Sequence, residues 1–283
     1  MKIAVVTIAT RNLNFRDYTI DNSRDYCRRH GYDFILYEER IDPTVAIITN
    51  KTIGVLENID NYDWILMKDA DSLFYNFTYK IEDYIDDEYN YIGSKSKIEG
   101  HVNLGHLLIK CTPETKTELL TILPVIKERV VIKGEQPIYN EFWNEEKISP
   151  VKKLEKQIFN AAPFGKENWN EWLSWEELEE RVNQNINYER YSDIINDTFI
   201  VHYPGNFLKT RDELLDQQIY RNESSSKYVW NFSDSYLLEF ISMYNRIKEK
   251  FPNKINRKTV FNKIPYGTRV KKSERKKIKY KKG

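Results

Sequence analysis

The chain of 283 residues has only two cysteines, four histidines and no long apolar run. Two cysteines make no disulfide framework, which indicates a reducing compartment. No stretch reaches the ~18 apolar residues of a membrane span. The apolar start of the chain is followed at once by Arg11 and Asn12, which argues against a signal peptide. We therefore expect a cytoplasmic protein, with peripheral contact to a membrane left open.

Glycine is also scarce: there are ten residues and no glycine-rich phosphate loop. The remaining composition is that of an ordinary globular protein, with 40% hydrophobic and 31% charged residues. A chain of this length is sufficient for one large α/β domain, or for one domain with an appendage.

Positive charge is concentrated at the C-terminal end. Nine Lys and Arg residues against Glu274 give the stretch Arg269–Lys282 a net charge of +8, which leaves −7 for the rest of a chain whose total is +1. Such a run binds phosphates or docks on an anionic membrane surface, unless it is only a solvated terminus. One alternative is therefore a non-catalytic protein that binds nucleic acid or a membrane through this tail, although no specific nucleic acid is expected.

Short β-branched runs alternate with segments of helical spacing in the first seventy residues. The expected elements are a strand at Lys2–Ala9, a helix at Phe15–His30 ended by Gly31, a strand at Tyr32–Tyr37, a helix at Ile47–Ile59 and a strand at Trp64–Met67. This order predicts a Rossmann-like, mostly parallel sheet flanked by helices. The polar loop Thr10–Asn12 follows the first strand, where such folds bind nucleotides.

The rest of the chain predicts a second half and an extension. The expected elements are a short helix at Tyr79–Tyr84, strands at Tyr89–Gly93 and His101–Cys111, helices at Pro113–Glu128, Glu135–Trp143 and Glu176–Asn183, a strand in Thr198–Asn206, and helices at Thr210–Tyr220 and Ser235–Lys250. We expect a catalytic domain at 1–215, divided near residue 100, then a helical appendage at 216–268 and a basic, disordered tail at 269–283.

Two carboxylates follow the apolar strand Trp64–Met67. Asp69 and Asp71 are two residues apart, so in an extended segment they point to the same side. Hard divalent ions such as Mn²⁺ and Mg²⁺ take oxygen ligands, often with a diphosphate completing the shell. The alternative is an acidic turn without a ligand.

A histidine ends a later apolar strand. His202 precedes the turn Pro204-Gly205, and it is either a third ligand for the two carboxylates or a structural residue. Gly105 interrupts the strand His101–Cys111, and glycine there often marks close approach of a ligand or of another segment. His106 beside it is a weaker candidate for contact with a ligand.

An ordered set of segments resembles glycosyltransferase family 34, the galactosyl, xylosyl and mannosyl transferases. The set spans about residues 1–210 and consists of Tyr26–Tyr32, Lys51, Tyr62–Asp71, Asn103-Leu104-Gly105, Glu135-Gln136 and His202–Gly205. The resemblance implies a GT-A fold, a metal held by Asp69, Asp71 and His202, and a nucleotide-sugar donor. It departs from the family at Gly134-Glu135, where an acidic pair is expected, and at Asn206-Phe207, where a Cys-Lys pair is expected.

The resemblance also implies roles for further residues. Gln136 and Glu135 would be catalytic, with Gln136 steadying the sugar ring and Glu135 positioning the acceptor hydroxyl of a glycan. The residues expected to hold the donor are Thr7, Thr10, Arg11, Lys51, Asp69, Asn103, Gly105, Gly205 and Lys209. Transfer would retain the configuration of the sugar, with Mn²⁺ or Mg²⁺ stabilising the departing diphosphate. A second alternative is an Asp-x-Asp phosphatase, although its motif normally lies on the first strand.

Overall fold

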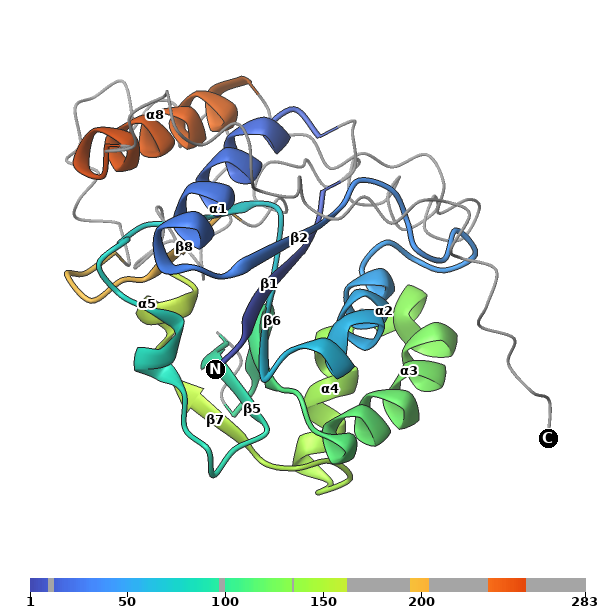
Figure 1. Cartoon of the computed structure of the whole chain (residues 1–283). Helices are drawn as coiled ribbons and strands as arrows, with labels where there is room; N and C mark the ends of the chain where they lie inside the picture. The colour runs from blue at the N-terminus through green and yellow to red at the C-terminus, as the bar shows by residue number, and fades with distance from the viewer. Residues whose placement is uncertain (10–12, 97–99, 134, 162–193, 204–233, 253–283) are drawn as a thin grey trace.

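The computed structural model describes residues 1–9, 13–96, 100–133, 135–161, 194–203 and 234–252 (Figure 1). Within these ranges, six strands form one sheet in the order β2-β1-β3-β6-β5-β7. The strands are β1 (Ile3–Ile8), β2 (Asp33–Tyr37), β3 (Trp64–Lys68), β5 (Tyr91–Lys95), β6 (Val102–Lys110) and β7 (Val151–Leu154).

The sheet is mostly parallel, as the sequence predicts. β1 is parallel to β2 and to β3, and β5 is parallel to β7. β6 alone runs against both of its neighbours, β3 and β5. The antiparallel β6 returns the chain across the middle of the sheet, so that Gly105 and His106 lie beside the end of β3.

Helices cover both faces of the sheet (Figure 1). The helices are α1 (Arg16–His30), α2 (Thr49–Asn58), α3 (Pro113–Lys133), α4 (Glu135–Asn144) and α8 (Asp234–Lys250). Alternate residues of β1 and β3 point to opposite faces. Val5 and Leu66 belong to the core shared with α1 and α8, whereas Val6 and Met67 belong to the core shared with α2, α3 and α4. The predicted mixed α/β architecture is therefore confirmed.

Helix α8 packs along α1, far from it in sequence (Figure 1). Phe240 meets Phe15 with ring centroids 5.8 Å apart, and Tyr244 meets Tyr18 at 5.3 Å. The Lys248 ammonium is 2.9 Å from the Asp21 carboxylate. The predicted helix at 235–250 is thus present and joined to the sheet domain through α1.

The sequence does not predict three short elements, namely β4 (Ser72–Phe74), β7 and α5 (Lys156–Phe159). Strand β4 pairs with β8 (Ile200–His202) in a separate two-stranded sheet. Short 3-10 helices occupy Ile59–Asn61 and Ile81–Tyr84. Helix α3 extends to Lys133 rather than ending at Glu128. The helices predicted at 176–183 and 210–220, and the basic tail, lie outside the described residues, and the division into domains stays a prediction.

Candidate metal and donor site

The two aspartates lie in the turn that joins β3 to β4. β3 ends at Lys68 and β4 begins at Ser72, so Asp69, Ala70 and Asp71 form the whole connection. The Asp69 N–H donates to the Gly105 carbonyl at 2.8 Å, which ties the start of the turn to β6. The turn therefore leaves the sheet at the carboxyl end of a parallel strand, the usual place for ligands in open α/β sheets.

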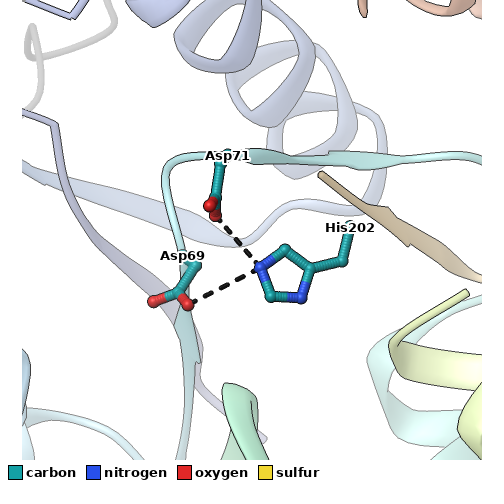
Figure 2. Close-up of side chains that lie close together, drawn as sticks. All are labelled: Asp69, Asp71 and His202. Atoms are coloured by element: carbon teal, nitrogen blue, oxygen red, sulfur yellow. Dashed lines mark hydrogen bonds and ion pairs between the residues drawn. The ribbon is translucent and has the colours of Figure 1, made fainter. Parts of the chain in front are cut away.

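Strand pairing brings His202 to this turn. β8 pairs with β4 in antiparallel register, with Ser72 opposite His202. Just beyond the pair, the Tyr203 N–H donates to the Asp71 carbonyl at 2.8 Å. The Nε2 atom of His202 consequently lies 3.1 Å from Asp71 Oδ1 and 3.8 Å from Asp69 Oδ2, as Figure 2 shows.

The orientation of the His202 ring is fixed from its other side. Its Nδ1 donates to Asn160 Oδ1 at 2.5 Å, which leaves Nε2 to face the two carboxylates. The ring lies against Gly105, where an added Cβ would be 2.7 Å from His202 Cε1. The glycine in β6 is thus needed for close approach, as the sequence indicates, and the approaching group is the imidazole.

The three side chains fit a divalent metal ion. One ligand atom from each of Asp69, Asp71 and His202 lies within 4.8 Å of the others. Two carboxylates and an imidazole suit Mn²⁺ or Mg²⁺, and a ligand paired through its second nitrogen is typical of metal-bound histidine. Burial raises the pKa of Asp71, but the adjacent His202 outweighs this and holds the pKa below its ordinary value. A deprotonated carboxylate is the form that binds metal.

Lys51 and Glu135 extend the site on the side of Asp69. The Lys51 ammonium lies 2.7 Å from Asp69 Oδ1, 2.5 Å from Glu135 Oε1 and 3.3 Å from the Leu104 carbonyl. Burial lowers the pKa of Lys51, but the two carboxylates raise it by more, so the side chain stays charged. Burial raises the pKa of Glu135 to about 7, against the opposite effect of Lys51. In this structure Lys51 orients Asp69, and a direct contact with the donor stays a prediction.

The other predicted residues make contacts within the protein. Gln136 Oε1 accepts from the Leu104 N–H at 3.2 Å, and Asn103 Oδ1 accepts from the Gly105 N–H at 2.8 Å. Thr7 is buried in β1, with no hydrogen-bond partner for its hydroxyl among the described residues. Their roles toward a donor or acceptor stay predictions. The predicted residues that lie outside the described ranges are Thr10, Arg11, Gly205 and Lys209.

His106 lies opposite Lys68 in β6 and contacts Ser72 of β4. It is fully buried, and its Nε2 donates to Ser72 Oγ at 2.8 Å. Burial lowers its pKa well below the ordinary value, so the ring is neutral. The expectation that His106 reaches a ligand is therefore corrected to a supporting role beneath β4. Asn160, which fixes His202, was missed because a single Asn after a four-residue helix has no distinctive sequence pattern.

Comparisons with known proteins support the fold. No family model matches the chain, and no curated protein matches its sequence. Among solved structures, the chain is similar to a glycosyltransferase involved in glycosylation of the major capsid of PBCV-1, with 15% identity and a TM-score of 0.52 over 77% of this chain and 99% of that one. A galactosyltransferase, LgtC, overlaps at 13% identity with a TM-score of 0.45, over 86% of this chain and 95% of that one. The likeness to the first of these shows that the chain has the GT-A glycosyltransferase fold, and it does not single out family 34.

None of the helices in the described ranges is long and apolar enough to cross a membrane.

Proposed function

We propose that this protein is a metal-dependent glycosyltransferase that moves a hexose or pentose from a nucleotide sugar to a glycan acceptor. The observation that best supports this proposal is that Asp69, Asp71 and His202 lie together at the carboxyl edge of a GT-A sheet. Mn²⁺ or Mg²⁺ is the expected ion, and UDP or GDP the expected carrier of the sugar. The proposed place in metabolism is glycan biosynthesis.

The largest catalytic demand in such a transfer is the negative charge that builds on the departing diphosphate. A divalent ion at this site supplies Lewis-acid stabilisation of that charge. Asp69, Asp71 and His202 would hold the ion, with Asn160 fixing the imidazole. Lys51 would keep the Asp69 carboxylate in place through its 2.7 Å contact.

Retention of the sugar configuration, as implied by the resemblance to family 34, belongs to the same proposal. Glu135 and Gln136 begin helix α4 beside Lys51 and β6. Gln136 would steady the sugar ring and Glu135 would position the acceptor hydroxyl. Among the described residues, the remaining expected contacts to the donor come from Thr7, Asn103 and Gly105; Thr10, Arg11, Gly205 and Lys209 belong to the same prediction and lie outside the described ranges.

The direct test is a screen of UDP- and GDP-sugars with the purified protein and Mn²⁺. Slow hydrolysis of the correct donor is expected even when the acceptor is missing, and it should stop with EDTA. Asp69→Asn and Asp71→Asn should each lower turnover by about 100-fold or more, since each removes an ionised ligand. Asp87→Asn, at an exposed carboxylate away from the site, is the matched control.

Two results would contradict the proposal. Turnover of a nucleotide sugar at the wild-type rate by both aspartate variants would exclude the metal site. Release of inorganic phosphate from simple phosphomonoesters, without release of a nucleoside diphosphate from any sugar donor, would favour the phosphatase alternative.

A further inference from the structure

Lys68 is a lysine with no access to solvent, and it directly precedes the first aspartate of the site. Its exposed fraction is 0%, at the last position of β3. Burying an ammonium group is costly unless it is fully hydrogen-bonded. A methionine or leucine would satisfy the apolar strand pattern at this position, so the lysine calls for a specific explanation.

Burial lowers the pKa of Lys68 to about 7, against the opposite effect of Asp71 and Asp69, and the surroundings of its Nζ match the ammonium form. The nitrogen lies 2.7 Å from the Ser72 carbonyl, 3.2 Å from the Asp69 carbonyl and 3.4 Å from Thr19 Oγ1. The Thr19 hydroxyl donates its hydrogen to the Ser72 carbonyl at 2.8 Å, so its oxygen is left as an acceptor for the lysine. Three acceptors thus meet the three donors of an ammonium group.

Two of these acceptors, the backbone carbonyls, belong to the metal-site turn. The carbonyls of Asp69 and Ser72 stand at the two ends of the turn that carries Asp71. Ser72 Oγ also donates to the Asp69 carbonyl at 2.8 Å, and Tyr203 N–H donates to the Asp71 carbonyl. The carbonyls of Asp69, Asp71 and Ser72 are therefore held by donors of the protein, while the two carboxylates face His202 (Figure 2).

We propose that Lys68 is a positioning residue that holds the 69–72 turn in its metal-binding shape through the carbonyls of Asp69 and Ser72. This inference rests on the proposed metal site. A turn fixed before the ion arrives has less conformational freedom to lose on binding, and that gain appears as higher metal affinity. The hydrogen bonds of Lys68 go to two backbone carbonyls and to Thr19, not to the carboxylates of Asp69 and Asp71. Its positioning effect therefore passes through the backbone, beside the electrostatic attraction between its charge and those carboxylates.

The test measures Mn²⁺ binding directly, by electron paramagnetic resonance of free Mn²⁺. The stability of each variant is measured separately, by urea unfolding without metal. Lys68→Met keeps the length of the side chain and removes the three donors. We expect it to weaken Mn²⁺ binding by about 10- to 100-fold, the range for partners that orient metal ligands. The unfolding midpoint should change little, because Thr19 and Ser72 still donate to the same two carbonyls.

Asn22→Leu is the matched control. Asn22 makes two buried hydrogen bonds from α1 to Phe74 in β4, at 2.8 and 3.1 Å, but none to the turn. It should lower the unfolding midpoint and leave the Mn²⁺ dissociation constant unchanged. Thr19→Val removes one acceptor of Lys68 together with the Thr19 donor to the Ser72 carbonyl, and it should weaken Mn²⁺ binding by a few-fold. Lys68→Leu, which removes the ammonium alone, decides the question if Lys68→Met does not fold.

The outcomes separate this inference from the proposed function. If the wild-type protein binds no Mn²⁺, the metal site itself is wrong, and the role of Lys68 with it. If the wild type binds Mn²⁺ and the variants at Lys68 and Thr19 bind it equally well, only the positioning role is overturned. Tighter binding by Lys68→Met would also overturn it, because repulsion between the two cations would then outweigh the gain in geometry.

Discussion

Gly105 is the residue at which one added methyl group should disturb the site most. Its Cβ would be 2.7 Å from the His202 ring and 2.9 Å from Asn103 Oδ1. Gly105→Ala should therefore displace the imidazole and lower metal-dependent turnover by about 10-fold or more, with about 1–3 kcal/mol of lost stability from overpacking. Steady-state assays and urea unfolding measure the two effects.

Gly93→Ala is the control for Gly105→Ala in the same sheet. The new Cβ would be 2.6 Å from Val102 Cγ1, so overpacking is comparable, but no metal ligand is among its contacts. It should lose stability and keep its affinity for Mn²⁺. Equal Mn²⁺ affinity in both alanine variants would contradict the role given to Gly105.

Glu135 should make stability depend on pH. Burial raises its pKa from 4.5 to about 7 in the folded chain. Between pH 4.5 and pH 7, the folded state therefore keeps a proton that the unfolded state has lost. Its contribution is fully present below pH 4.5 and is lost as the pH rises through 7. Relative to Glu135→Gln, the wild type should lose about 1–3 kcal/mol between pH 5 and pH 8. Urea unfolding at both pH values tests this, and parallel curves for the two proteins would contradict it.

At the scale of elements, α8 contributes directly to the support of the site. The Phe240 ring packs edge-on against Tyr203, with centroids 4.9 Å apart, and Tyr203 holds the Asp71 carbonyl. Phe240→Ala should cost about 3–5 kcal/mol, the usual loss for a buried phenylalanine. Leu238→Ala, 66% exposed on the same helix, should change stability by less than about 0.5 kcal/mol.

The unfolding of the Phe240→Ala variant also tests whether α8 folds together with the sheet. If α8 and the sheet unfold together, Phe240→Ala shifts the single transition followed by tryptophan fluorescence and by circular dichroism alike. A helix that melts separately would leave the main transition in place, and would support the predicted appendage at 216–268 as an independent unit.

The main elements were predictable from the sequence because their periodicity is strong. The apolar runs of β1 and β3 are covered on both faces, and Gly31 ends α1 in the left-handed conformation with φ 77°. The pairing of β4 with β8 was not predictable, because Ser72-Leu73-Phe74 is too short to show the periodicity of a strand. Its partner lies far along the chain, and nothing local specifies the register.

The candidate site was predictable as a set of residues but not as a geometry. Spacing placed Asp69 and Asp71 on one side of the chain. The position of His202 at the end of an apolar strand, together with the resemblance to family 34, added the histidine. The supports of these residues are Lys68 and Asn160, whose roles depend on backbone atoms and a ring nitrogen supplied by distant segments. Patterns of side chains along a sequence contain no information about such contacts.

At the scale of the whole molecule, bound metal should stabilise the folded chain. A ligand that binds only the folded state adds about 2.7 kcal/mol at 100 times its dissociation constant. Thermal unfolding with Mn²⁺ should therefore occur at a higher temperature than with EDTA, and Asp71→Asn should abolish this difference. An equal shift in wild type and variant would place the bound Mn²⁺ elsewhere.

The distance along the chain between Asp71 and His202, 131 residues, has a consequence for synthesis. Both aspartates leave the ribosome long before the histidine has been added, since chains emerge from the N-terminus onward. A nascent chain thus carries only two of the three proposed metal-binding groups, and the turn that bears them does not yet have its contacts with β8. The full set of three groups in the proposed metal site is therefore complete only after His202 has been synthesised and β8 has paired with β4.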